Sequence, residues 1–176
     1  MTSTTGPAKQ PVTVLAGPYG HPFHPILVNV PIGAWVTSLV FDLASHLVDE
    51  PAFLARGSIW LIAVGVLGAL AAAMVGFLDL LAIPGGTAAF RTGLLHMSLN
   101  LTVTAGYAAN FGWRQAGHLD AGPVPAGPLA LSVVSLLVLG VAGRLGGKLV
   151  FRYGVRVADE ATQAEGFTAR STRSSN

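Results

Sequence analysis

The chain has 176 residues, of which 52% are hydrophobic and 10% charged, whereas ordinary soluble domains carry about 25% charged residues. It contains no cysteine, which excludes disulfide bonds, thiolate-bound iron–sulfur clusters and covalently attached c-type haem, but leaves open a haem or metal held by histidine. The net charge is only +2, so the composition indicates no nucleic-acid surface.

Four long apolar stretches follow a polar N-terminal segment. They cover residues 26–48, 58–82, 88–111 and 128–150, and each is close to the ~20 residues that a helix needs to cross the core of a bilayer. A segment in lipid must satisfy its backbone hydrogen bonds internally, and a helix does so. The sequence therefore predicts an all-α fold, an integral membrane antiparallel four-helix bundle.

The polar ends give the domain organisation and the orientation. Residues 1–20 are predicted to be a polar segment, 21–152 the transmembrane domain and 153–176 a disordered tail. Basic residues gather at the C-terminal end, and the positive-inside rule places that end in the cytoplasm. Four crossings then place the N-terminus there too. The basic residues concerned are Arg144, Lys148, Arg152, Arg156, Arg170 and Arg173.

Small residues lie in register on two of the stretches, which predicts close packing of the helices. On the second stretch they are Gly65, Gly68, Ala72 and Gly76, and on the fourth Gly140, Gly143 and Gly147.

This topology gathers ionisable residues near the cytoplasmic end. His24 begins the first stretch, Asp79 ends the second, and Arg91 and His96 lie early in the third. Ionisable groups inside a span are costly, at about 2.5–3.5 kcal/mol, so they usually face the interior and a partner. We therefore expect these residues to form one layer, with Asn29 and Asn100 about one turn deeper.

His24 and His96 are the predicted metal and cofactor ligands, because two imidazoles on different helices at similar depth are typical of haem or metal sites in helical bundles. A b-type haem would take both as axial ligands, Arg91 would pair with a propionate and Asp79 would accept an imidazole N–H. The alternative is structural: His24 caps the first helix, and His96 hydrogen-bonds Asp79 or Asn29.

A second polar cluster faces the opposite side of the membrane. Asp42 and His46 are four residues apart and share a helix face, so they are expected to pair. The functional interpretation is a second ligand set or a step in a proton path, and the simpler one is an interfacial salt bridge.

The motif His-Pro-Phe-His-Pro-Ile-Leu-Val-Asn-Val-Pro-Ile-Gly, at residues 21–33, resembles the opening of domain-of-unknown-function family 2231. Gly76-Phe-Leu-Asp79 and residues 91–100 extend the likeness over most of residues 20–150. The resemblance implies a small bacterial inner-membrane protein with four helices, and fusion of some members to Rieske-type domains implies membrane electron transfer. Asn29 departs from the pattern, where many members carry a further histidine.

The leading hypothesis is a multi-pass membrane protein that binds b-type haem and exchanges electrons with a quinone or a Rieske-type partner. It is closer to an accessory subunit than to a stand-alone enzyme, since the sequence has no phosphate-binding loop and no Ser/His/Asp set. One alternative is a small transporter or ion-conducting subunit, whose polar stripes would join across the midplane and which would need a homo-oligomer. The other is a non-catalytic membrane anchor or assembly subunit.

Overall fold

A computed structural model describes residues 6–117 and 122–168. Within these ranges the chain is helical and contains no strand, which confirms the all-α prediction. The elements are α1 (Gly6–Lys9), η1 (Val14–Ala16), α2 (His24–Leu27), α3 (Asn29–Ala44), α4 (Ala52–Leu81), α5 (Ala88–Ala116), α6 (Ala126–Gly147), η2 (Lys148–Arg152) and α7 (Glu160–Glu165).

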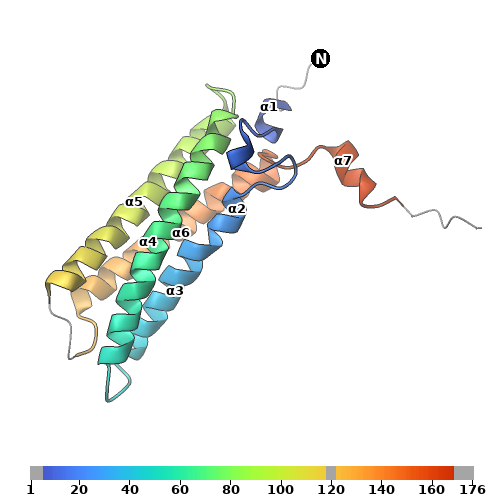
Figure 1. The fold of residues 1–176 in the computed structure, drawn as a ribbon. Coiled ribbons are helices and arrows are strands. Elements are labelled where there is room, and N and C mark those ends of the chain that lie inside the picture. The colour runs from blue at the N-terminus through green and yellow to red at the C-terminus, as the bar shows by residue number, and fades with distance from the viewer. Residues whose placement is uncertain (1–5, 118–121, 169–176) are drawn as a thin grey trace, which may run out of the picture.

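The four long helices α3 to α6 lie side by side (Figure 1). Each packs against the next one in the chain, and α6 also packs against α3, so α3 and α5 occupy one diagonal of the group and α4 and α6 the other. Short connections reverse the direction at each step. Consequently α3 and α5 run the same way, and their N-terminal residues lie at the same end.

Three segments of the described chain are long and apolar enough to cross a membrane: His24–Ala44, Ala52–Leu81 and Ala126–Arg152. The helix α5 is long enough but less apolar, because it carries His96, Asn100, Asn110 and two arginines. Its lower hydropathy therefore has an identifiable source in a few polar side chains.

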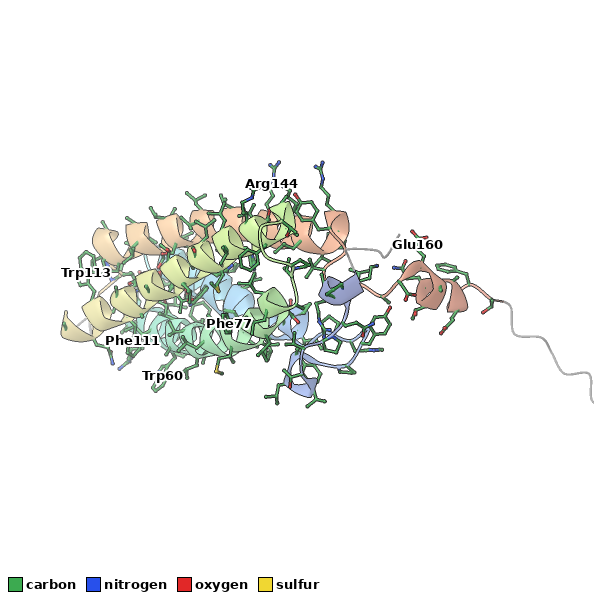
Figure 2. The ribbon with its side chains drawn as sticks, turned by 90° about the horizontal axis from the view of Figure 1, so that it is seen from above. Trp60, Phe77, Phe111, Trp113, Arg144 and Glu160 are labelled. Carbon is green, nitrogen blue, oxygen red and sulfur yellow. The ribbon has the colours of Figure 1, made fainter. Side chains whose placement is uncertain are left out.

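Large apolar side chains cover the outer surface of the four helices. Trp60, Phe77 and Trp113 have exposed fractions of 74%, 48% and 55%, and Figure 2 shows Trp60 at the edge of the molecule. Apolar residues exposed over the length of several helices are unusual for a monomeric soluble protein. This surface suits a hydrocarbon environment.

The first apolar stretch is broken at Val28 into α2 and α3, at a site between Pro25 and Pro31. Pro31 has no N–H for the carbonyl four residues earlier, which weakens the helix there. The third stretch was expected to end at residue 111, but α5 continues to Ala116. Arg114, which follows the expected end of that stretch, is thereby a residue of a helix and is fully buried, with an exposed fraction of 1%.

The N-terminal segment and the segment after η2 pack against one end of the four long helices. Residues of α1 and of the segment after η2 form an apolar cluster with the end of α4, the turn that follows it and η2; its buried members are Ala8, Leu80, Ile83, Leu149 and Val155. The tail was expected to be disordered from residue 153, but Arg156 N donates to Ala8 O at 2.9 Å. The short helix α7 then projects away from this end (Figure 1). Arg170 and Arg173 lie outside the described residues.

The glycine pattern of α4 reflects close packing, as predicted. A Cβ at Gly65, Gly68 or Gly76 would meet Trp35, Val30 or His24 respectively, at less than 3 Å. The prediction for α6 is wrong at Gly140 and Gly143, where a Cβ would have nothing within 4 Å. The close contacts of α6 are made by Gly127 against Trp113 and by Gly146 against His96 instead.

Candidate functional site

The rings of His24 and His96 face each other between the diagonal helices. Their centres are 6.3 Å apart and their planes meet at 86°. His24 is the first residue of α2, and His96 lies in the third turn of α5, so the matched depth expected from the sequence is present. The structure therefore brings the two predicted ligands together.

Each imidazole is anchored by one ring nitrogen to the following long helix. His24 Nδ1 lies 2.9 Å from Ala72 O in α4, and His96 Nδ1 lies 2.8 Å from Ala142 O in α6. A carbonyl oxygen only accepts, so Nδ1 carries the proton in both rings. In a neutral imidazole this leaves Nε2 with its lone pair, which is the arrangement found in histidines that bind metals.

A glycine lies beside each ring, one turn after the accepting carbonyl. A Cβ at Gly76 would be 2.8 Å from His24 Cε1, and a Cβ at Gly146 would be 3.0 Å from His96 Cε1. In both rings Nε2 is the farthest of the three nearest ring atoms from the glycine, at 3.4 and 3.8 Å. Cε1 and the two ring nitrogens thus lie on the side of the glycine, and Cγ and Cδ2 lie farther from it.

A second layer lies deeper, where Trp35 of α3 stacks on Tyr107 of α5. Their ring centres are 4.3 Å apart and their planes are inclined by 9°. Each again reaches the following helix, since Trp35 Nε1 donates to Ile62 O at 3.4 Å and Tyr107 Oη to Ser132 O at 3.3 Å. Both rings are at most 2% exposed.

A third layer near the far end joins Asp42 of α3 to Arg114 of α5. The distances are 2.7 Å from Nη1 to Oδ1 and 2.6 Å from Nη2 to Oδ2, and both side chains are fully buried. Ser58 and Ser132 also contact this pair, and Arg114 Nε donates to Asn110 Oδ1 at 2.8 Å. The expected pair of Asp42 with His46 is not formed. His46 lies beyond the end of α3 and is exposed, whereas a guanidinium offers two parallel N–H groups to the carboxylate.

The three layers are built from equivalent positions of two helical hairpins. Asp42 and Arg114 are 72 residues apart in the chain. The same separation relates Trp35 to Tyr107 and His24 to His96. One constant separation also relates the second helices of the hairpins, Ala72 to Ala142 and Gly76 to Gly146. The hairpins α2–α3–α4 and α5–α6 are therefore related by an approximate two-fold axis along the helices, and the paired side chains meet on it.

Asp79 and Arg91 do not take the places expected beside the imidazoles. Asp79 Oδ1 lies 2.8 Å from Arg156 Nε, an ion pair whose angle is too bent for a hydrogen bond. Arg156 also donates from Nη2 to Ala16 O and Gly17 O, at 2.9 and 2.8 Å. The positive charge of the guanidinium stabilises the buried carboxylate by Coulomb attraction even without a hydrogen bond. Arg91 is exposed in the first turn of α5.

The two asparagines behave differently from each other. Asn29 is exposed and donates to Pro25 O at 3.0 Å, so it lies outside the layer of the histidines. Asn100 donates to His96 O at 2.8 Å, and its amide nitrogen is 3.3 Å from both ring nitrogens of His96. Thr104 in turn donates to Asn100 O. The polar stripe of α5 is thus largely bonded to its own helix.

The family model described as a predicted membrane protein, DUF2231, matches residues 20–159. The chain belongs to this family. No curated protein and no solved structure matches it. The match covers α2 to η2, and so includes all three layers and both hairpins. In this DUF2231 chain the elements that carried the resemblance, residues 21–33, 76–79 and 91–100, converge on the end where the histidine rings lie.

Sequence reasoning missed the buried roles of Arg114 and Arg156. For Arg114 a signal existed in the sequence. Trp35 and Asp42 follow His24 at the same distances at which Tyr107 and Arg114 follow His96. This repeat continues in Ala44-Ser-His-Leu47 and Ala116-Gly-His-Leu119. For Arg156, which adopts a left-handed conformation with φ 59°, we find no such signal.

The two imidazoles fit the axial positions of a haem, but the surroundings do not leave room for the porphyrin. Gly93, three residues before His96, leaves no open space, since a Cβ there would be 2.7 Å from Leu80 Cδ1. A Cβ at Gly106 would be 3.0 Å from Ser135 Oγ. At the level of the rings, α4 and α6 approach to the limit that glycine allows. In this packing the porphyrin plate does not fit between the helices.

Proposed function

We propose that this chain is a multi-pass membrane protein in which His24 and His96 hold a redox-active metal centre that serves membrane electron transfer. The observation that carries the proposal is the pair of rings 6.3 Å apart, each with Nδ1 bonded to a carbonyl. In this proposal each imidazole would supply one ring nitrogen to the metal. Such pre-orientation by a bond at the other ring nitrogen raises metal affinity.

All four long helices would cross the bacterial inner membrane as an antiparallel bundle, with both termini in the cytoplasm. For α5, support comes from the distribution of its polar groups, since Asn110 and Arg114 are buried and bonded within the protein. Its outward face is apolar, with Leu94, Leu95 and Leu101 exposed. A span tolerates polar side chains when they face the interior and a partner.

The sequence predicts b-type haem as the form of this centre, with His24 and His96 as axial ligands. Bound haem would supply a one-electron couple, and a quinone or a Rieske-type protein would be the redox partner. For a porphyrin to enter, α4 and α6 would have to move away from the rings of His24 and His96. For this reason the proposed function rests on the two imidazoles and not on the porphyrin.

A transport route is less well supported. Between the histidine layer and the Asp42–Arg114 layer lies an apolar cluster whose members are at most 2% exposed: Trp35, Ile62, Val103 and Tyr107. It separates the two polar groups that a transporter would have to connect. A non-catalytic anchor is the second candidate, favoured by the Asp42–Arg114 layer, whose charged groups are paired internally.

The test is metal analysis together with reduced and oxidised absorption spectra of the purified full-length protein. We expect one metal equivalent or one haem per chain, and its loss in His24→Ala and in His96→Ala. His46→Ala is the matched control, because it removes an exposed histidine at the other end of the helices. A protein that binds neither haem nor metal would leave the anchor as the better description.

A further inference from the structure

We propose that the surface formed by the end of α6 and by η2 binds the headgroup phosphate of an anionic phospholipid from the surrounding bilayer. The site is a surface groove of about 590 Å³, lined by Arg144, Leu145, Gly147, Lys148, Phe151 and Arg152. Figure 2 shows Arg144 at the edge of the molecule. Occupancy of this groove is independent of a metal centre between His24 and His96. Its charge, its level in the membrane and the apolar surface beside it all suit this ligand.

The groove carries three cations that have no acidic partner among the described residues. Arg144, Lys148 and Arg152 follow one another at steps of four along α6 and η2. Within residues 6–117 and 122–168 the two ion pairs are formed by other arginines, so no carboxylate neutralises these three. Lys148 Nζ lies 5.4 Å from the ring centre of Tyr153, a contact that leaves its charge in place. The groove is therefore positive and attracts an anion.

The groove lies where α6 and η2 leave the apolar part of the membrane. The apolar segment that they form runs from Ala126 to Arg152, so the three cations lie in its last turns. Helices rise about 1.5 Å per residue, which places Arg144 about 12 Å deeper along the axis than Arg152. Long basic side chains near the end of a span extend their charged groups toward the headgroups. The three cations therefore reach the level at which phospholipid phosphates lie.

Phe151 lines the groove beside these cations. Its side chain is large and apolar, yet its exposed fraction is 90%. The ring lies near Gly147, because a Cβ there would be 3.8 Å from Phe151 Cδ2. An exposed phenylalanine next to basic residues is typical of surfaces that bind anionic lipid, since the ring enters the hydrocarbon boundary while the cations stay among the phosphates.

An exposed apolar strip continues from the groove toward the middle of α6. Leu137 and Val141 precede Arg144 by seven and three residues, so they share its helix face, and both are exposed. Gly140 and Gly143 adjoin them, and a Cβ at either glycine would have nothing within 4 Å. An acyl chain can lie along this strip while its phosphate lies in the groove. This continuity favours a phospholipid over a free anion, which would contact the cations alone.

The experiment is native mass spectrometry of the purified full-length protein, released from detergent micelles that contain phosphatidylglycerol or phosphatidylcholine with the same acyl chains. We expect the protein to retain one phosphatidylglycerol with at least about fivefold higher affinity than phosphatidylcholine, since a basic residue at an anionic lipid surface contributes about this factor. Inorganic phosphate at millimolar concentration should not displace the lipid, because it has no acyl chain to contact the strip.

Variants of the lining residues locate the binding. Arg144→Gln and Lys148→Gln each remove one cation and should lower the affinity for phosphatidylglycerol about fivefold, whereas Arg144→Lys keeps the charge and should retain most of it. Arg56→Gln is the matched control, because it removes an exposed cation at the other end of the helices and should leave the affinity unchanged. Arg152→Gln, at an exposed lining residue, replaces Lys148→Gln if that variant does not accumulate.

Three results would overturn the proposed lipid site. Equal retention of phosphatidylglycerol and phosphatidylcholine would mean that the groove does not select an anionic headgroup. Equal losses of affinity in Arg56→Gln and Arg144→Gln would assign the preference to the charge of the whole protein. Displacement of the lipid by inorganic phosphate would show a site for a free anion. Metal or haem content plays no part in these measurements, so the proposed redox centre can fail or succeed separately.

Discussion

Arg114 and Asp42 form a two-pronged ion pair that is wholly enclosed by protein, with Nη1–Oδ1 and Nη2–Oδ2 distances of 2.7 and 2.6 Å. It joins the two helices that lie on one diagonal of the group. The two side chains come from equivalent positions of the two hairpins. The pair therefore lies on the approximate two-fold axis, at the end opposite His24 and His96.

Removing one partner of this pair should strongly destabilise the protein. Arg114→Ala leaves the Asp42 carboxylate buried without its cation, which typically costs about 3–5 kcal/mol. Thermal unfolding in detergent micelles would measure it, with Arg56→Ala as the control because Arg56 is exposed. An unchanged transition temperature in Arg114→Ala would mean that water reaches the carboxylate.

Exchanging the two charges tests the two-fold relationship. Asp42→Arg and Arg114→Asp alone each bury two like charges and should unfold the protein or prevent its accumulation. The double exchange restores an ion pair on the axis, and it should recover about half or more of the loss in unfolding free energy. A double variant no more stable than the single ones would show that the surroundings of the two positions are not interchangeable.

The contact of Gly65 with Trp35 should tolerate no added methyl group. In Gly65→Ala the new Cβ would lie 2.5 Å from Trp35 Cδ1, and such overpacking costs about 1–3 kcal/mol. The Trp35 fluorescence spectrum should shift as its stack on Tyr107 is disturbed. It can be isolated by replacing the exposed Trp60 and Trp113 with phenylalanine. Gly143→Ala, where a Cβ meets open space, serves as the comparison.

Arg156 should hold the N-terminal segment in place. It donates to Ala16 O and Gly17 O and pairs with Asp79, so Arg156→Ala removes three contacts at once. We expect faster proteolysis and at least about tenfold faster amide exchange in residues 6–20, because a local opening costs less free energy. Arg152→Ala, an exposed arginine one turn earlier, should change neither rate. Equal protection in both variants would assign the ordering of this segment to apolar contacts alone.

The sequence determined the helical character of the chain and the end at which the histidines gather. These follow from local properties: runs of apolar residues must be helical in lipid, and short connections reverse the chain. Close packing at the glycines of α4 was also predictable, because a row of small residues along one helix face allows a neighbouring segment to approach closely. The pairing of His24 with His96 followed from depth along the helices, which is fixed by counting residues.

The tertiary structure decided which partner each polar group takes. Asp42 faces Arg114 and not His46, Asp79 faces Arg156 and not an imidazole, and each histidine bonds a backbone carbonyl. Depth is a property of one helix, but a partner depends on how each helix is rotated about its own axis and on contacts between segments far apart in the chain. Those rotations are set by the packing of all the helices at once, and no local stretch of residues contains them.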